Sequence, residues 1–239
     1  MSDRYLILSD LHLADVEDHP DGWKFFKGRR YLFDAELRTL LEGFRARCPG
    51  SATLLLNGDV FDFDLVTAVP PDPPWPVTRR ERRCGLRPTE DKSAWKLGRI
   101  LEHHPLFVDA LATFLAAGNR VVHVLGNHDR ELVFPGVQAV LRDALHKTAR
   151  AAGGDFDEGA LSFEPWFHHV PGRLYAEHGH QYDFYNSCRY LLDPVVDRGG
   201  IPELGLPMGN LSNRLLMARM GYFNPHTGDY IMGGFRYLL

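Results

Sequence analysis

The chain has 239 residues, and its 27 Lys and Arg against 31 Asp and Glu give a net charge of −4. With 44% hydrophobic and 24% charged residues, the composition excludes a disordered or fibrous protein and fits one large α/β domain, alone or with an appendage. The acidic balance argues against nucleic-acid binding by bulk charge. No apolar run is long enough to span a bilayer, which leaves peripheral membrane contact open.

The cysteines and the N-terminal residues indicate a location. Cys48, Cys84 and Cys188 are widely spaced and odd in number, so we expect neither a disulfide framework nor a Cys-rich zinc site. Residues 4–8 read as a strand followed at once by acidic residues, without a secretory leader. The cytoplasm is therefore the expected compartment.

The first elements predict a parallel sheet. Residues 5–8 form a short apolar run of strand length, and apolar side chains recur at helical spacing over 31–47. Residues 53–56 form a second buried strand, which Asn57 and Gly58 end. A strand, helix and strand in this order imply a right-handed crossover with parallel pairing.

The middle of the chain continues this pattern after an interruption. Residues 69–90 are rich in Pro and Arg and keep neither the helical nor the strand period, so we expect a long excursion from the core. A helix is predicted over 91–117 with a break near Pro105, followed by a strand over 121–125 and a helix over 137–151.

The last third is less regular. Residues 161–169 and 174–177 are predicted as two further strands, and loops with a short amphipathic helix over 211–220 follow. We therefore expect a core over residues 1–192 and a helical appendage, or the start of an inserted cap, over 193–239.

Four polar clusters follow strands of this predicted sheet. They are Asp10-Leu11-His12, Gly58-Asp59-Val60-Phe61-Asp62, Gly126-Asn127-His128-Asp129 and His178-Gly179-His180. Because ligands bind at the carboxyl ends of the strands in open α/β sheets, we expect the four clusters to converge on one edge.

The residue types and their spacing favour metal binding. Residues i and i+2 of an extended segment point the same way, so Asp10 and His12 can hold one ion together. Asn127 and His128 are adjacent, so one can bind metal while the other faces a substrate. Carboxylate, amide and imidazole ligands suit Mn, Fe or Zn better than an all-oxygen calcium site.

Each cluster also has an ordinary structural explanation. Asp10 can cap a following turn, Gly-Asp and Gly-Asn are common turn dipeptides, and His178 and His180 can be surface histidines. Four such clusters in this order, three of them after clear strands, favour the metal-site interpretation.

The clusters resemble those of the calcineurin-like metallophosphoesterase superfamily, over about residues 4–185, and most closely its bacterial branch that includes UDP-2,3-diacylglucosamine pyrophosphatases. The resemblance implies an α/β fold, a four-layer α/β/β/α sandwich with two metal ions at its top edge. It further implies that Asp10 and His12 hold the first ion, that Asp59 bridges both, and that Asn127 and His178 hold the second.

The resemblance also implies a reaction. Two divalent ions, Mn first and Fe or Zn as alternatives, would activate a water to cleave a phosphate ester or pyrophosphate bond in a phosphorylated small-molecule or lipid-like substrate. His128 would contact the phosphoryl group or the leaving oxygen, oriented by Asp62 or Asp129.

One family motif is not found. The family normally ends its site with a later Gly-His-x-His segment, but the one histidine after His180 is His226. Three explanations remain: the chain is a piece of a longer enzyme, His180 or His226 replaces the missing ligand, or the centre is degenerate. In the first and third cases the domain could act as a protein-interaction scaffold.

Overall fold

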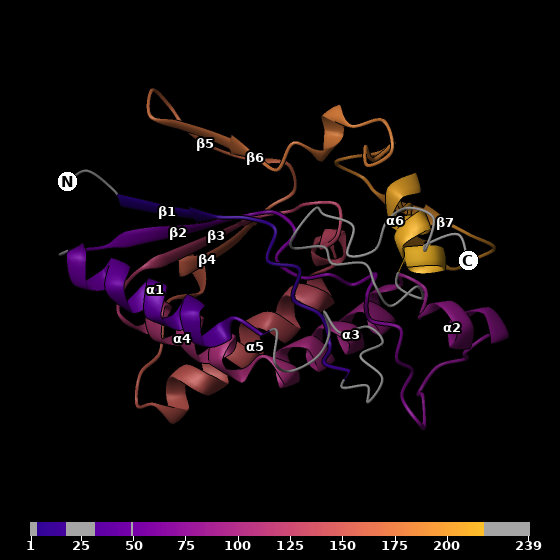
Figure 1. Ribbon diagram of the computed structural model, residues 1–239, viewed down its shortest axis with the longest axis horizontal. Helices are drawn as coiled ribbons and strands as arrows, with labels where there is room; N and C mark the ends of the chain where they lie inside the picture. Colours follow the sequence, from indigo (N-terminus) through magenta and orange to yellow (C-terminus); the bar gives the residue numbers. More distant parts are fainter. Residues whose placement is uncertain (1–3, 18–31, 49, 218–239) are drawn as a thin grey trace, which may run out of the picture.

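The computed structural model describes residues 4–17, 32–48 and 50–217. The main sheet has four parallel strands in the order β1, β2, β3, β4 (Figure 1). Its strands are Arg4–Leu8, Ala52–Asn57, Arg120–Val124 and Leu161–Glu164. The predicted parallel pairing of the first three strands is confirmed.

One face of the sheet is covered by helices (Figure 1). They are α1 (Asp34–Arg47), α3 (Glu90–His103), α4 (Pro105–Ala116) and α5 (Pro135–Ala151). The predicted break near Pro105 is confirmed, since α3 ends at His103 and α4 begins at Pro105. Proline fits the first turn of a helix but not its interior. The sequence predicts a helix over 31–47. The observed helix, α1, begins at Asp34, and Tyr31 lies outside the described residues.

The apolar runs of the strands explain this packing. In β2, Leu54 and Leu56 face the main hydrophobic core, whereas Leu55 between them packs with Val122 and Val124 on the opposite face. Adjacent side chains of a strand alternate in this way, so a sheet buried on both faces requires a continuous apolar run.

The second β layer is a hairpin of β5 (Phe167–Val170) and β6 (Leu174–Glu177), which lies over the other face of the sheet (Figure 1). The single strand predicted over 161–169 is wrong. It divides at Pro165 and Trp166, and only its first part pairs with β3. Proline lacks the N–H that a continuing strand would donate.

The excursion over 69–90 contains a short helix that its composition did not predict, α2 (Arg79–Cys84). Thr78 and Glu81 form a reciprocal capping box that begins this helix. Glu81 also accepts a hydrogen bond from the buried Lys92 at 2.6 Å. The excursion is thus attached to the core by a buried ion pair.

The C-terminal part holds β7 (Val195–Asp197), β8 (Pro202–Leu204) and α6 (Met208–Ser212), followed by a π-helical turn, η6 (Asn213–Met217). The helix predicted over 211–220 therefore begins earlier, and its last three residues and His226 lie outside the described residues. The division at residue 192 stays a prediction.

Three short 3-10 turns complete the described elements. They are Arg130–Val133, Glu158–Ala160 and His180–Tyr182. None of the helices in the described part of the chain has the length and apolar character needed to cross a membrane.

Candidate metal centre

The segments after β1 and β2 run side by side and bring the first two clusters together. The backbone N–H of Asp10 donates to the carbonyl of Gly58 at 3.0 Å, and the N–H of His12 donates to the carbonyl of Asp59 at 2.9 Å. The parallel pairing of the strands therefore continues into the polar clusters, as the predicted convergence requires.

Backbone strain is concentrated at these positions. Among the described residues, the non-glycine residues with positive φ are Asp10, His12 and Asp59, at 55°, 46° and 54°. The left-handed conformation costs such a residue about 1–2 kcal/mol. Strain of this kind is typical of functional sites, where the surrounding structure holds side chains in set positions.

Two glycines leave room for the candidate ligands. A Cβ atom on Gly58 would lie 2.4 Å from the ring of His178, and a Cβ atom on Gly126 would lie 2.1 Å from Oδ1 of Asp59. Neither contact is sterically possible without displacement. Glycine is required here so that the loops after β2 and β3 can approach these side chains.

A first group of candidate ligands consists of Asp10, Asp59 and His178, whose ligand atoms lie within 4.8 Å of one another. His178 donates from Nδ1 to the carbonyl of Asn57 at 3.0 Å, and its Nε2 lies 3.1 Å from Oδ2 of Asp59. The carbonyl contact orients the ring so that Nε2 faces the carboxylates.

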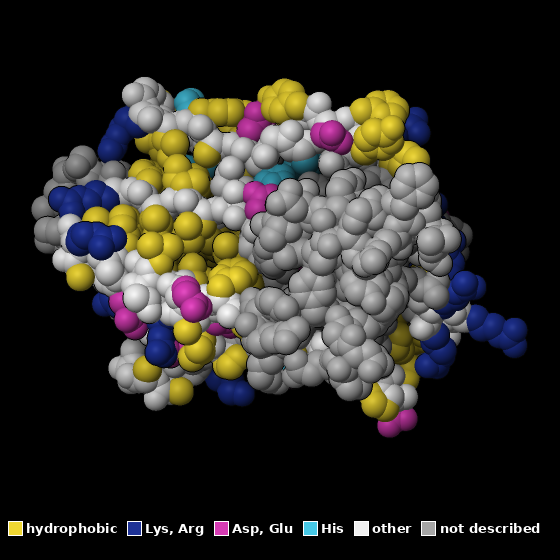
Figure 2. Space-filling view, in the orientation of Figure 1, with side chains coloured by type: hydrophobic (Ala, Val, Ile, Leu, Met, Phe, Trp, Pro, Cys, Tyr) yellow, Lys and Arg dark blue, Asp and Glu magenta, His cyan; other side chains and the backbone are white. Residues whose placement is uncertain are grey.

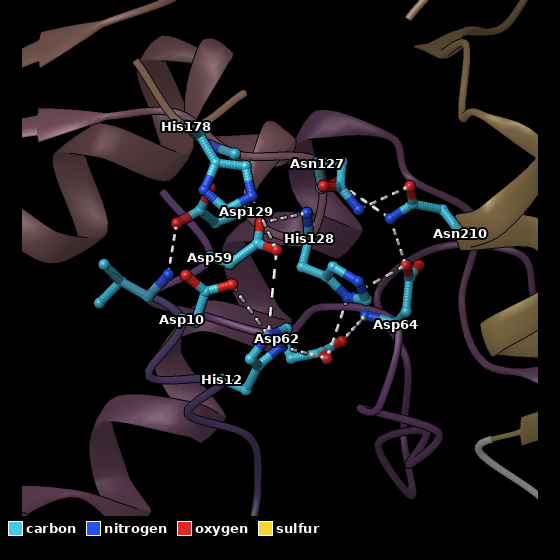
Figure 3. Close-up of polar contacts among 12 residues, drawn as sticks. Asp10, His12, Asp59, Asp62, Asp64, Asn127, His128, Asp129, His178 and Asn210 are labelled. Carbon is cyan, nitrogen blue, oxygen red and sulfur yellow. Dashed lines mark hydrogen bonds and ion pairs between the residues drawn. The ribbon is translucent and has the colours of Figure 1, made fainter. Parts of the chain in front are cut away.

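A second group consists of His12, Asp62 and His128. The Nδ1 atoms of both histidines lie 3.0 Å from the same oxygen, Oδ2 of Asp62 (Figure 3). Nε2 of His12 lies 3.9 Å from Oδ1 of Asp10 and from Oδ2 of Asp59. Asp62 therefore holds His12 with its other nitrogen toward the first group.

Asn127 and His128 enter the site from the loop after β3. The backbone N–H of His128 donates to Oδ1 of Asp59 at 2.9 Å, and both side chains line the same cavity. Asn127 itself is hydrogen-bonded to Asn210 of α6 (Figure 3). The third cluster thus lies beside the first two.

Asp129 has different neighbours from those expected of a residue that orients His128. It is fully buried and accepts hydrogen bonds from Nε2 of His123 at 2.8 Å, from the N–H of Val60 at 2.8 Å and from the N–H of Gly126 at 2.7 Å. Asp62 contacts His128, whereas Asp129 joins the loops that follow β2 and β3.

His180 lies in the cavity but in neither ligand group. Its ring is buried, and neither nitrogen has a hydrogen-bond partner among the described residues. Burial and the neighbouring His178 lower the pKa of His180 to about 4. A neutral imidazole with two unused nitrogens can bind a metal ion or a substrate group.

The charged side chains of the site shift one another's pKa values. Burial alone would raise the pKa of Asp59 and Asp62, but nearby histidines, His128 foremost, outweigh it and hold both pKa values below the usual range. Burial likewise opposes the charging of His178, but its hydrogen bond to Asp59 raises the pKa of His178 to about 9. The carboxylates of Asp59 and Asp62 are therefore ionised at neutral pH.

The cavity that these residues share measures about 720 Å³. Histidine and acidic side chains gather near the upper centre of the face shown in Figure 2. The cavity lining comprises Asp10, His12, Asp59, Asn127, His128, His178, His180, Tyr185, Asn186, Met208, Gly209, Ser212 and Asn213. The last six residues of this lining were not predicted, and neither was the buried Asp64, which contacts Asn210. Asp64 stands at i+2 from Asp62, a spacing that could have indicated it.

The donor set fits divalent metal ions. Carboxylates, imidazoles and one amide of the described residues converge without a thiolate, and such mixed oxygen and nitrogen sets suit Mn, Fe and Zn. Three candidate ligands have a strained backbone, and two neighbouring positions have room for glycine alone. Both observations indicate that the surrounding structure holds these side chains together.

Comparisons with known proteins identify the family. No curated protein and no solved structure gives a significant match. A family model described as calcineurin-like phosphoesterase matches residues 3–199, which include all four polar clusters. The match confirms the superfamily and leaves the UDP-2,3-diacylglucosamine branch as a prediction. The chain belongs to the calcineurin-like phosphoesterase family.

Proposed function

We propose that this chain is a phosphohydrolase that uses two divalent metal ions and a water molecule to cleave a phosphate ester or pyrophosphate bond. The observation that carries the proposal is that the ligand atoms of Asp10, Asp59 and His178 lie within 4.8 Å of one another. The second group, in which His12 and His128 contact Asp62, lies beside them. The family match supports metal-dependent phosphoester hydrolysis in general.

The proposed ligands come from all four clusters. They are Asp10, His12, Asp59, Asn127, His178 and His180. His180 is included because its ring lies in the cavity and, in the part of the chain that the structure describes, neither nitrogen has a hydrogen-bond partner. We take Mn as the first choice of metal and Fe or Zn as alternatives, because all three accept carboxylate and imidazole ligands.

The side chains around the ligands would serve the reaction. When bound, the ions supply Lewis acidity toward the phosphate and lower the pKa of water. Nδ1 of His128 lies 3.0 Å from the carboxylate of Asp62. Nε2 is therefore the ring atom left to donate a proton or hydrogen bond to the leaving oxygen. Asp129 would act indirectly, through its hydrogen bonds to Val60 and Gly126.

The rim of the cavity supports a phosphorylated small molecule or lipid-like substrate. Tyr185 and Met208 line the cavity and are 57% and 63% exposed. Phe184 beside them is 85% exposed. Exposed apolar side chains next to a charged centre favour a substrate with an apolar portion and permit peripheral membrane contact. A cytoplasmic location stays a prediction.

The test is metal-dependent turnover. Purified chain should bind divalent metal and hydrolyse a generic phosphomonoester or phosphodiester with Mn²⁺. Asp59→Asn and His128→Ala should each lower the rate about 100-fold or more. Asp155→Asn, a matched change of an exposed carboxylate that pairs with His146 away from the cavity, should leave it unchanged.

One result would refute the enzyme. If a folded, metal-supplemented sample shows neither bound metal nor turnover, the alternative of a degenerate interaction scaffold is favoured. Activity with this chain would argue against the need for a further Gly-His-x-His segment, and His180→Ala and His226→Ala would then show which histidine replaces it.

A further inference from the structure

Asn210 of α6 is a buried residue that contacts the candidate metal centre from outside the four clusters. It is 1% exposed. Its Nδ2 donates to Oδ2 of Asp64 at 2.6 Å and to the carbonyl of Asn127 at 2.9 Å. Its Oδ1 accepts a longer hydrogen bond from Nδ2 of Asn127 at 3.4 Å. Every polar atom of this amide is therefore used, and two of its contacts are to Asn127 (Figure 3).

These contacts decide which way the Asn127 amide points. An asparagine side chain binds a cation through its oxygen, so its NH2 group must face away from the ion. Oδ1 of Asn210 can only accept, so it selects the orientation in which Nδ2 of Asn127 faces α6. Oδ1 of Asn127 is then the atom left free for the cavity that both Asn127 and the carboxylates line.

Asn210 is itself fixed in place. Asp64, which accepts its shorter hydrogen bond, is 2% exposed and lies 3.6 Å from Nε of Arg214, in the π-helical turn that follows α6. Arg214 also contacts the carbonyl of Leu86. At the start of α6, the N–H of Gly209 donates to the carbonyl of Tyr185 at 2.7 Å. The helix is therefore held on both sides of Asn210.

We propose that Asn210 is a positioning residue for the metal-binding amide of Asn127. The hydrogen bonds of Asn210 hold the Asn127 backbone in place and turn its amide oxygen toward the ion. This inference rests on the proposed function, because it assigns Asn127 as a ligand. It makes α6 a part of the metal centre, although the sequence suggested a separate appendage.

The test is metal affinity. Mn²⁺ titration of the metal-free chain by calorimetry should show two sites, and Asn210→Ala should weaken one of them about 10-fold or more, the range found for groups that orient metal ligands. Raising the Mn²⁺ concentration should restore the hydrolysis rate of Asn210→Ala, which a merely structural defect would not permit. Leu211→Ala, an exposed change in the same helix outside the cavity, should match wild type.

The possible failures are distinguishable. If wild type binds no metal, the proposed function fails and this inference fails with it. If wild type binds metal and folded Asn210→Ala binds it equally well, this inference alone is overturned. Thermal unfolding of the metal-free variant reports whether it folds. Should Asn210→Ala not fold, Asn210→Ser removes the same carbonyl acceptor, and the same loss of affinity is expected of it.

Discussion

The carboxylate of Asp62 controls where the protons of two site histidines lie, and Asp62→Asn should therefore weaken metal binding. In the native site, Oδ1 of Asp62 accepts hydrogen bonds from the N–H groups of Asp64 and Leu65, both at 3.1 Å. Oδ2 faces Nδ1 of His12 and Nδ1 of His128, both at 3.0 Å. A carboxylate can accept all four contacts, so both rings can carry a proton on Nδ1.

An asparagine at position 62 cannot do the same. Its single oxygen will stay with the two backbone N–H groups, because turning it away would leave two buried donors unpaired at a cost of about 1–3 kcal/mol each. Its NH2 group then faces both Nδ1 atoms, which must become acceptors. The proton of His12 moves to Nε2, the atom that lies 3.9 Å from Asp10 and Asp59. A protonated Nε2 cannot bind an ion.

The expected loss follows from that change of tautomer. Removing a partner that orients a metal-binding histidine costs about 10- to 100-fold in affinity, which corresponds to about 1.4–2.8 kcal/mol. Calorimetric titration with Mn²⁺ measures it directly. Asp155→Asn is the matched control, because Asp155 contacts Nδ1 of His146 at 2.6 Å outside the cavity. If folded Asp62→Asn binds Mn²⁺ as tightly as wild type, the tautomer argument is wrong.

Two further changes test the packing that supports the site. Gly58→Ala should lower both the free energy of unfolding and the Mn²⁺ affinity, because a Cβ there meets the ring of His178 at 2.4 Å. Gly172 also has a positive φ, but a Cβ there meets no described residue within 4 Å other than its chain neighbours, so Gly172→Ala should leave the Mn²⁺ affinity unchanged in a parallel urea and calorimetry series. Glu81→Gln should cost about 3 kcal/mol or more at pH 7, because it leaves the buried Lys92 without its carboxylate. Burial opposes ionisation of Glu81, but hydrogen bonds led by the one from Lys92 lower its pKa from 4.5 to about 2, so its stabilisation is full above pH 4.5 and is lost as the pH falls toward 2. The difference in urea midpoint between Glu81→Gln and wild type should shrink over that range, and a constant difference would contradict this assignment.

The parallel sheet and the position of the site could be predicted because both depend on short stretches of sequence. A strand buried on both faces needs a continuous apolar run, and residues 53–56 show one that ends directly at Asn57 and Gly58. The carboxyl ends of parallel strands meet at one edge, so the clusters that follow β1, β2 and β3 were expected together and lie together.

The errors have local physical causes. The strand predicted over 161–169 ignored Pro165, whose missing N–H ends the pairing with β3. The composition of the excursion over 69–90 predicts no helix, although Thr78 and Glu81 stand at the spacing of a capping box. In both cases the sequence carries the local signal, but it is shorter than the apolar or Pro-rich and Arg-rich pattern around it.

Asn210 differs from these cases because the sequence around it carries no signal of metal chemistry. It is 83 residues from Asn127, and the contact depends on how the loops and short strands between β6 and α6 return the chain to the sheet edge. Leu204, for example, donates its backbone N–H to the carbonyl of Pro88 at 3.0 Å, which fixes β8 against the excursion. A candidate ligand on a strand end is positioned by the sheet itself, whereas the residue proposed to turn it comes from a distant segment. Motifs therefore predict the candidate ligands of such a centre, and the residues that contact and orient them have to be found from the three-dimensional structure.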